Sequence, residues 1–511
     1  MAVGEDSKRL VEKQDLLNLS ILLSLALGIG VYLIATTVLI AKDGVFYIER
    51  AQEFASNPLR IIKGHPFGYP FLIFLAHKLV AFFGNSSSVS AWIYSAQSVS
   101  LIFRVLSFIP LYFIGKTLVG SKKTFWALLV LVFLPHPAKY GSDTLRDWPH
   151  LLFLAAGFFL LLWGAKNAKW WSFGLAGLAA GLGYMIRPEC AQLVVYGILW
   201  LLICLVRPRP TMSRPALTSA LCVLLIGFAV PVVPYMKATG RVLPRKLKAL
   251  ISSDYQTPSR TKPQQKWQDA GHSCQEAGMA ANTAQGMWRL IQQISEDLMH
   301  FFMPALLIGI YSCFRRKSGL LTEETFFIAA FVILNVIMLV LLYSSYGYIS
   351  RRHCLPLVAF IIFYVPVGLQ ILAVWLSHTL SRRSGKSSPP ETADSPLFYV
   401  LLVTGLLICL PKLVRPIGFD KKGYRDAADW LRKYSTEADI VIVPDTRVSF
   451  YAQRKGYLDA NRVLKRAAYA LIITENENEP LNLARAAQKV YSVTVDKRKK
   501  KGRKIVVYKM L

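Results

Sequence analysis

The chain has 511 residues, of which 54% are hydrophobic and only 18% charged, below the roughly 25% that is usual for soluble proteins. Lysine and arginine total 60 and aspartate and glutamate 30, so the formal net charge is +30. This composition excludes a disordered chain, and seven cysteines are too few for a disulfide scaffold. A soluble enzyme is disfavoured, and we expect a membrane protein with a basic charge balance.

Long apolar runs predict many membrane-spanning helices. The first, 17–41, carries no charge and is long enough to cross a hydrocarbon layer of about 30 Å. It is too long for the core of a signal peptide, so we expect it to be retained. The apolar stretch 68–83 is interrupted by His77 and Lys78. The sequence therefore leaves open whether this stretch spans the membrane or lies at its interface. The other predicted spans are 89–115, 124–135, 150–164, 171–186, 190–206, 216–235, 300–313, 325–345, 355–376 and 397–411.

Five short basic loops give the orientation. They are nearly free of acids, and the positive-inside rule places such loops, with the N-terminus, in the cytoplasm. Their charges are Lys116, Lys122 and Lys123; Lys166 and Lys169; Arg207, Arg209 and Arg214; Arg315, Arg316 and Lys317; and Arg382, Arg383 and Lys386. The loops 42–67, 136–149, 236–299 and 346–353 are then expected to face outward.

Residues 412–511 differ from the preceding part, 1–411, and predict a small soluble domain. Strand-length apolar runs alternate with helical patterns at 424–433 and 481–488, which favours an α/β fold. The segment has 23 lysines and arginines against 11 aspartates and glutamates, a net charge of +12. Domains of this length cross membranes largely regardless of charge, so we expect it on the outward, periplasmic side. The predicted strands are 440–443, 470–473, 490–495 and 505–508.

Carboxylates at the outward ends of the spans are the first candidate site residues, because charge at membrane depth is costly and marks function. Asp43 follows the first span, where a carboxylate suits a general base or a metal ligand. The alternative is an interfacial pair with Lys42. Asp147 precedes the span 150–164, where the helix dipole also favours a negative charge.

Cations gather on the same outward side. Arginine and lysine suit a phosphate or diphosphate ligand, by a bidentate grip or as a point charge. The structural alternatives are an internal ion pair at 187–189, lipid headgroup contacts at 240–248 and a basic interfacial anchor at 346–353. The candidates for phosphate binding are Arg187, Arg241, Arg245, Lys246, Arg351 and Arg352, with Glu189 beside the first.

Carboxylates beside many cations suggest group transfer from a phosphorylated lipid, because carboxylates activate hydroxyls and cations stabilise an anionic leaving group. The sequence holds no Walker A loop, no GxGxxG after a strand, no HExxH and no CxxC pair. ATP-driven transport, nicotinamide chemistry and zinc hydrolysis therefore have no support. The alternatives are a transporter or flippase for a lipid-linked sugar, for which no internal repeat is evident, and a membrane scaffold.

Five motifs, in this order, resemble the C-type (GT-C) membrane glycosyltransferases. The nearest group contains the bacterial protein O-mannosyltransferases and the aminoarabinose transferase of lipid A. The motifs are Asp-Gly-x-x-Tyr at 43–47, His-Pro-x-Gly-Tyr-Pro at 65–70, Thr-Leu-Arg-Asp at 144–147, Gly-Leu-Gly-Tyr-Met-Ile-Arg-Pro-Glu at 181–189 and Tyr-x-Ser-Arg-Arg-His at 348–353. The stretch 423–451 also resembles the small outward domain of such enzymes.

The resemblance implies an α-helical polytopic membrane protein with roughly 11 to 13 transmembrane helices and a small C-terminal α/β domain. It implies transfer of a sugar from a polyprenyl-phosphate donor to a hydroxyl of a glycolipid, polysaccharide or protein. The site is expected on the periplasmic side of a bacterial inner membrane, with the bilayer and no nucleic acid as partner.

The resemblance also implies roles for single residues. Asp43 matches the acid taken as catalytic base, and Asp147 matches the second-loop acid that supports the base or the acceptor. His65 matches a basic residue near the donor phosphate, although Phe67 stands where relatives often have a second proline. The implied phosphate partners are Arg187, Arg241, Lys246 and Arg352. No cofactor is indicated with certainty, because the sequence has no metal-ligand spacing that would settle the question, and a divalent metal stays open. The choice between inversion and retention also stays open.

Overall fold

Helices that are apolar along most of their length make up the greater part of the chain. In the computed structural model, the described residues are 12–83, 88–206, 212–240, 279–316, 322–383, 396–458, 463, 466–475, 486–496 and 502–511. Eight helices in this part of the chain are long and apolar enough to cross a membrane. They are α1 (Lys13–Ala35), α5 (Val89–Val119), α8 (Asp147–Asn167), η1 (Pro188–Ala191) continued by α10 (Gln192–Val206), α11 (Arg214–Thr239), α15 (Glu323–Tyr346), α16 (Arg351–Ile361) continued by η2 (Ile362–Tyr364) and α17 (Val365–Arg383), and α18 (Pro396–Leu413).

Other apolar helices are shorter or bent. The predicted spans 124–135 and 171–186 and the open stretch 68–83 are helices of 13, 17 and 16 residues. The predicted span 300–313 belongs to a pair of helices that meet at 111°, and the pair counts as one further span if it is a broken helix. The chain is a multi-pass integral membrane protein. The shorter helices and the bent pair are α6 (Ser121–Phe133), α9 (Trp170–Ile186), α4 (Gly68–Phe83), α13 (Met279–Asp297) and α14 (Phe302–Arg316).

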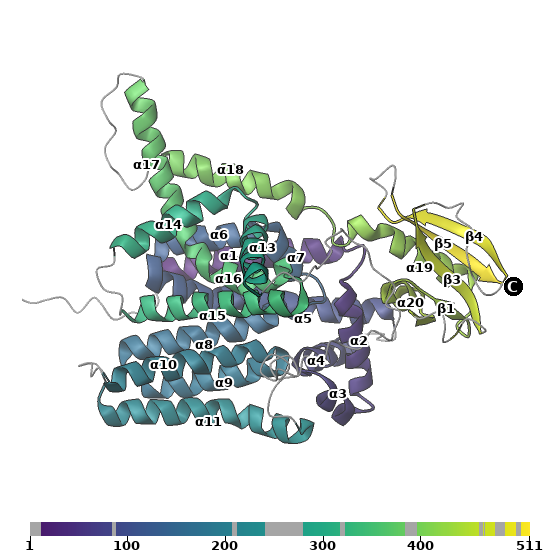
Figure 1. Cartoon of the computed structure of the whole chain (residues 1–511), viewed down its shortest axis with the longest axis horizontal. Helices are drawn as coiled ribbons and strands as arrows, with labels where there is room; N and C mark the ends of the chain where they lie inside the picture. The colour runs from purple at the N-terminus through teal and green to yellow at the C-terminus, as the bar shows by residue number, and fades with distance from the viewer. Residues whose placement is uncertain are drawn as a thin grey trace, which may run out of the picture.

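The first helix ends earlier than its apolar run. α1 stops at Ala35, six residues before the predicted end of the span at Ala41. The hydroxyls of Thr36 and Thr37 donate to the carbonyls of Tyr32 and Leu33, at 2.9 and 2.8 Å, and these bonds close the last turn. The predicted outward loop 42–67 is mostly helical, as α2 (Lys42–Phe54) and α3 (Pro58–Gly64). These short helices lie across the end of the bundle (Figure 1).

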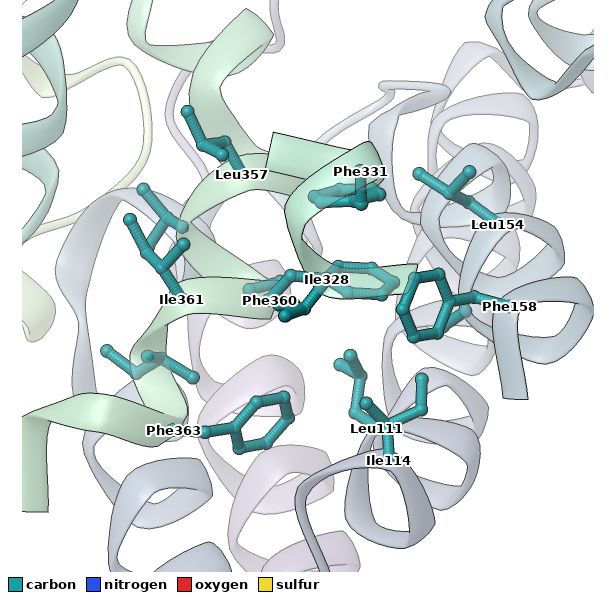
Figure 2. Close-up of a cluster of buried hydrophobic side chains, with 14 of the residues drawn as sticks. Leu111, Ile114, Leu154, Phe158, Ile328, Phe331, Leu357, Phe360, Ile361 and Phe363 are labelled. Carbon is teal, nitrogen blue, oxygen red and sulfur yellow. The ribbon is translucent and has the colours of Figure 1, made fainter. Parts of the chain in front are cut away.

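Aromatic and aliphatic side chains pack together in the hydrophobic core of the bundle (Figure 2). Phe360 of α16 stacks on Phe331 of α15, with ring centroids 4.0 Å apart, and meets Phe158 of α8 edge-on at 4.9 Å. All three side chains are fully buried. Because lipid chains are as apolar as these residues, close packing is what holds the helices together.

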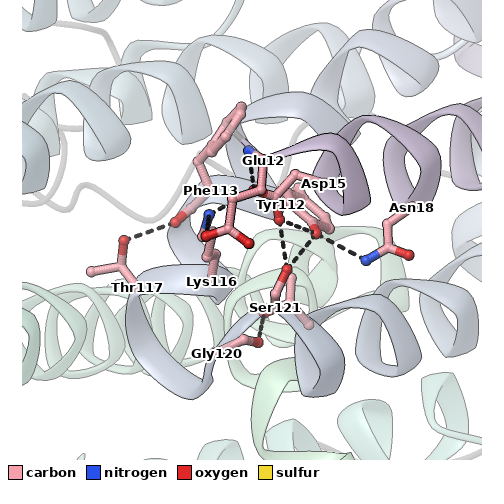
Figure 3. Close-up of polar contacts among 10 residues, drawn as sticks. Glu12, Asp15, Asn18, Tyr112, Phe113, Lys116, Thr117, Gly120 and Ser121 are labelled. Atoms are coloured by element: carbon pink, nitrogen blue, oxygen red, sulfur yellow. Dashed lines mark hydrogen bonds and ion pairs between the residues drawn. The ribbon is translucent and has the colours of Figure 1, made fainter. Parts of the chain in front are cut away.

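A buried polar network joins the start of α1 to the end of α5 and the start of α6 (Figure 3). The fully buried Asp15 of α1 accepts hydrogen bonds from Lys116 Nζ at 2.6 Å, Tyr112 at 2.8 Å and Ser121 at 2.6 Å. Lys116 lies in the last turn of α5, beside a loop that the positive-inside rule places in the cytoplasm. Its charge therefore also has a structural partner, which ties α5 and α6 to α1.

The C-terminal region forms a five-stranded sheet in the order β2-β1-β3-β5-β4. β1 is parallel to β2 and β3, whereas β5 is antiparallel to β3 and β4. β2 was not predicted, because three residues with mostly exposed side chains show no alternation. The predicted helix 481–488 lies mostly outside the described residues, and its last two residues begin β4. The elements are η3 (Phe419–Lys421), α19 (Lys422–Tyr434), β1 (Ile440–Ile442), α20 (Thr446–Ala452), β2 (Lys455–Tyr457), β3 (Ala467–Thr474), β4 (Ala487–Thr494) and β5 (Lys504–Met510).

The sheet domain packs on the end of the bundle that carries α2 (Figure 1). One continuous hydrophobic cluster contains Ile40 and Ile48 from the first outward segment together with Tyr424, Val448 and Tyr451 from the domain. The domain is therefore part of the surroundings of Asp43.

Candidate functional site

Asp43 lies in the first turn of α2, where the helix dipole stabilises its negative charge. Ala41, two residues earlier, is the N-cap of this helix. Its backbone N–H donates to Asp143 Oδ1 at 2.9 Å. Asp143 also accepts from the Thr144 backbone N–H at 2.7 Å. Burial raises the pKa of Asp143 despite these bonds. This acid of the second outward loop thus orders the start of α2.

Arg352 is the direct partner of Asp43. Its Nη2 lies 2.9 Å from Asp43 Oδ2, although the two residues come from α16 and α2. The side chains are 32% and 47% exposed, respectively. An ion pair this open adds only about 0 to 1 kcal/mol to stability. Stability is therefore a weak reason for the pair, and both groups remain accessible to a ligand.

Asp147 and Arg187 form a second, buried ion pair. Arg187 Nη1 lies 3.1 Å from Asp147 Oδ1, and the side chains are 11% and 3% exposed. Arg187 occupies an extended break between α9 and η1, whereas Asp147 begins α8. The internal ion pair that the sequence offered as the alternative at 187–189 does not form among the described residues. Arg187 pairs with Asp147 instead, and Glu189 is exposed. This buried pair links the start of α8 to the end of α9.

Tyr47 lies between the two ion pairs. It is one helical turn after Asp43, and the Arg146 guanidinium lies over its ring at 5.8 Å. Burial raises the pKa of Tyr47, the charges of Arg146 and Arg187 oppose this rise, and those of Asp43 and Asp147 add to it. All four charges therefore act on one buried phenol, which places the first, third and fourth sequence motifs in one cluster.

Two glycines of the motifs mark close contacts between outward segments. A Cβ on Gly44 would overlap the hydroxyl of Thr144, and a Cβ on Gly68 would lie 3.0 Å from the Met185 carbonyl oxygen. Gly44 thus lets α2 lie directly on the second outward loop. Gly68 lets α4 approach the end of α9.

Arg351 turns away from Asp43, unlike its neighbour Arg352. Its Nη1 lies 3.0 Å from His136 Nε2 and 3.6 Å from Glu296 Oε2. Burial and the charges of Arg351, Lys412 and Lys139 lower the pKa of His136 to about 3, so its imidazole is neutral. The predicted pair of arginines is therefore divided between two adjoining polar clusters.

The remaining candidates are placed less directly. The His65 ring meets the Phe46 ring edge-on, with centroids 5.4 Å apart. Phe46 belongs to α2, the helix that carries Asp43, whereas His65 follows α3. Arg241, Arg245 and Lys246 lie outside the described residues. Within the ranges that the structure describes, no group of three or more histidines, cysteines and acids is arranged to hold a metal ion.

His150 is a site residue that the sequence did not single out. It is 2% exposed, and neither ring nitrogen has a hydrogen-bond partner in the described part of the chain. The charges of Arg187, Glu189 and Asp147 act on it. The signal was the spacing of three residues from Asp147, which places both side chains on one face of α8.

Comparison with known proteins gives one family match and several similar folds. Residues 64–235 match the family described as dolichyl-phosphate-mannose-protein mannosyltransferase. The fold is similar to that of ArnT from Cupriavidus metallidurans in the apo state, with a TM-score of 0.56, 12% identity and coverage of 96% of this chain and 97% of that chain. The family match covers less than half of the chain, and at 12% identity the structural likeness shows a shared fold. The match includes the segments that carry His65, Asp147 and Arg187.

Two further solved structures are similar in fold. ArnT from Cupriavidus metallidurans bound to undecaprenyl phosphate has a TM-score of 0.54 at 12% identity and covers 96% of this chain and 97% of that one. The archaeal oligosaccharyltransferase AglB from Archaeoglobus fulgidus, in complex with an inhibitory peptide and a dolichol-phosphate, has a TM-score of 0.54 at 12% identity and covers 90% and 69%. No curated protein matches the chain in sequence. The match of residues 64–235 to a mannosyltransferase family favours a transferase over a flippase.

Proposed function

We propose that this protein is a GT-C enzyme that transfers a sugar from a polyprenyl-phosphate donor to a hydroxyl of a glycolipid, polysaccharide or protein. The observation that carries the proposal is the open ion pair of Asp43 and Arg352. It offers a base and a phosphate-binding cation within one hydrogen-bond distance of each other.

The chemistry follows from this pair. The acceptor oxygen forms a bond to the anomeric carbon of the sugar, and the bond from that carbon to the phosphate oxygen breaks. Asp43 accepts the acceptor's hydroxyl proton. The polyprenyl phosphate leaves with the bonding electrons, and Arg352 stabilises its negative charge. Because a donor phosphate competes for Arg352, its binding also frees the Asp43 carboxylate to act as base.

Lipid phosphates bound to similar folds support the choice of donor. One solved ArnT structure is bound to undecaprenyl phosphate, and one AglB complex contains a dolichol-phosphate. In the present chain we assign the phosphate to Arg352 first. Arg187 and His65 are proposed to act nearby, and Arg241, Arg245 and Lys246 are proposed to reach it from the segment outside the described residues.

We place the site on the periplasmic side of a bacterial inner membrane. The support is the basic character of the loops at the opposite ends of the spans, including Lys116 and Lys166. The division into a transmembrane domain, 1–411, and a small domain, 412–511, belongs to the same proposal. Because the small domain packs beside Asp43, it would share the periplasmic side.

A transfer assay with one substituted carboxylate tests the function. The purified full-length protein is reconstituted in liposomes with polyprenyl-phosphate mannose, and release of polyprenyl phosphate is measured with candidate acceptors. Asp43→Asn should abolish release. Glu53→Gln is the matched control, because Glu53 belongs to the same helix and pairs with Arg60 at 3.0 Å, away from Asp43. Equal rates for the parent and Asp43→Asn would exclude Asp43 as base.

A further inference from the structure

The segment that leads from α1 to Asp43 is held by residues from the C-terminal part of the chain. The backbone N–H groups of Val38 and Leu39 both donate to the Ile417 carbonyl, at 3.0 and 3.3 Å. Gly418 makes this approach possible, because a Cβ there would overlap the Leu39 carbonyl oxygen. The segment thus takes its backbone partners from the connection between α18 and the sheet domain.

Ile40 is bonded through both of its backbone polar groups to α20. Its N–H donates to the Tyr451 hydroxyl oxygen at 3.2 Å, and its carbonyl accepts from Arg447 Nη1 at 3.3 Å. Ile40 is fully buried and lies three residues before Asp43. Both bonds are therefore shielded from water. A hydrogen bond is electrostatically stronger in such a buried environment than in water.

The arginine in this contact is itself held rigidly. Arg447 Nε and Nη2 each donate to the Asp445 carboxylate at 2.9 Å, in a bidentate ion pair. Both side chains are buried, and Asp445 also caps α20 by accepting from the Arg447 backbone N–H at 3.0 Å. The guanidinium therefore meets Ile40 in a fixed orientation.

The opposite side of the segment is held by the membrane domain. The Ala41 N–H donates to Asp143, so the residues at 40 and 41 are gripped from the sheet domain and from the second outward loop. Apolar contacts already attach the domain to the bundle. The additional effect of directional bonds at Ile40 is to define where α2 begins, and hence where the Asp43 carboxylate lies.

We propose that the C-terminal domain positions the catalytic carboxylate, with Tyr451 and Arg447 as positioning residues that act through Ile40. The inference rests on the proposed function of Asp43. A reacting group must be held close to its productive geometry, and a displacement of about 1 Å is enough to lower a rate strongly. On this view the domain contributes to turnover without contacting the substrate.

Tyr451→Phe tests the proposal, because it removes one hydroxyl and leaves the ring, over which Arg425 lies at 4.2 Å. The matched control is Tyr469→Phe. The Tyr469 hydroxyl also donates to a backbone carbonyl, that of Tyr434 at 3.0 Å, but within the domain. Asp445→Asn combined with Arg447→Gln is a second variant, which replaces the ion pair by a neutral pair.

Two measurements on the full-length protein in liposomes are compared. Hydrogen exchange followed by mass spectrometry reports the protection of amides 38–41 and, as an internal reference, of β3. Release of polyprenyl phosphate from polyprenyl-phosphate mannose reports kcat and KM. We expect Tyr451→Phe to speed exchange at 38–41 about three- to tenfold and to lower kcat by a similar factor, with KM unchanged. Tyr469→Phe should change neither quantity.

The outcomes separate the proposal from the function beneath it. Faster exchange at 38–41 with an unchanged kcat would overturn the positioning role, as would equal losses of kcat in Tyr451→Phe and Tyr469→Phe. Unchanged exchange at 38–41 in both the phenylalanine variant and the double variant would also overturn it. A parent protein that releases no polyprenyl phosphate would refute the proposed function, while the exchange data would still show whether the domain holds the segment.

Discussion

Arg352 and Asp43 face each other at 2.9 Å from the first turns of two different helices, α16 and α2. The side chains of this pair are partly exposed to solvent, whereas those of the Asp147 and Arg187 pair are buried. From this difference in exposure we propose that the open pair takes part in the chemistry and that the buried pair has a mainly structural role close to it.

Replacing Arg352 should impair turnover more than folding. Arg352→Gln removes the cation that we assign to the leaving phosphate, and loss of one such stabilising group costs about 100-fold in rate. Arg60→Gln is the control, because Arg60 forms a comparably open pair with Glu53. Steady-state release of polyprenyl phosphate measures the effect, and equal rates for the two variants would remove Arg352 from the reaction.

Breaking the buried pair should destabilise the protein. Asp147→Asn leaves the Arg187 charge buried without its anion, which costs about 3 to 5 kcal/mol. Thermal unfolding in detergent should show the loss, and Asp147→Asn combined with Arg187→Gln should recover most of it because no unpaired charge remains. Asp429→Asn, in an exposed pair with Arg425, should have little effect. A stable single variant would contradict the structural role.

A methyl group on Gly44 should separate α2 from the second outward loop. Gly44→Ala places a Cβ against the Thr144 hydroxyl, and overpacking of this kind costs about 1 to 3 kcal/mol. Gly28→Ala is the matched control, since no atom lies within 4 Å of its added Cβ. Unfolding in detergent and hydrogen exchange of α2 would be measured. Similar stability of the two variants would count against the close contact.

The contact between Arg447 and Asp445 should weaken in acid. Burial opposes ionisation of Asp445, but hydrogen bonds and the charge of Arg447 lower its pKa below the ordinary 3.8. The group therefore stabilises the folded domain above pH 3.8, and this stability is lost as the pH falls through the lower folded pKa. The fluorescence of Trp430 against denaturant at several pH values would follow it. Asp445→Asn should show less acid sensitivity than the parent, and equal sensitivity would contradict the assignment.

Lys139 should be unusually reactive near neutral pH. Burial and the charge of Lys412 lower its pKa to about 8, so a large fraction of the amine is neutral and nucleophilic at that pH. Competitive acetylation with mass spectrometry should give half-maximal labelling of Lys139 near pH 8. Removing the neighbouring charge with Lys412→Gln should move this midpoint upward. An unchanged midpoint in Lys412→Gln would indicate that the two side chains lie further apart than they do in the structure.

The sequence by itself was sufficient for the membrane class, the resemblance to GT-C enzymes and the gathering of Asp43, Asp147 and Arg352 in one region. These features rest on local patterns of hydropathy, charge and short motifs, which do not depend on how helices pack. The same local reasoning extended the first span to Ala41, because apolarity alone does not reveal that Thr36 and Thr37 end the helix. It also missed His150, a buried histidine whose ring nitrogens have no hydrogen-bond partner among the described residues.

The tertiary structure alone decided which charges meet. Arg351 and Arg352 are adjacent in sequence, but successive residues of a helix point about 100° apart, so one reaches His136 and the other Asp43. Arg187 pairs with Asp147 rather than Glu189, and Tyr451 bonds to Ile40 across 411 positions of sequence. Such partners are set by the packing of distant segments, and no local pattern records that packing.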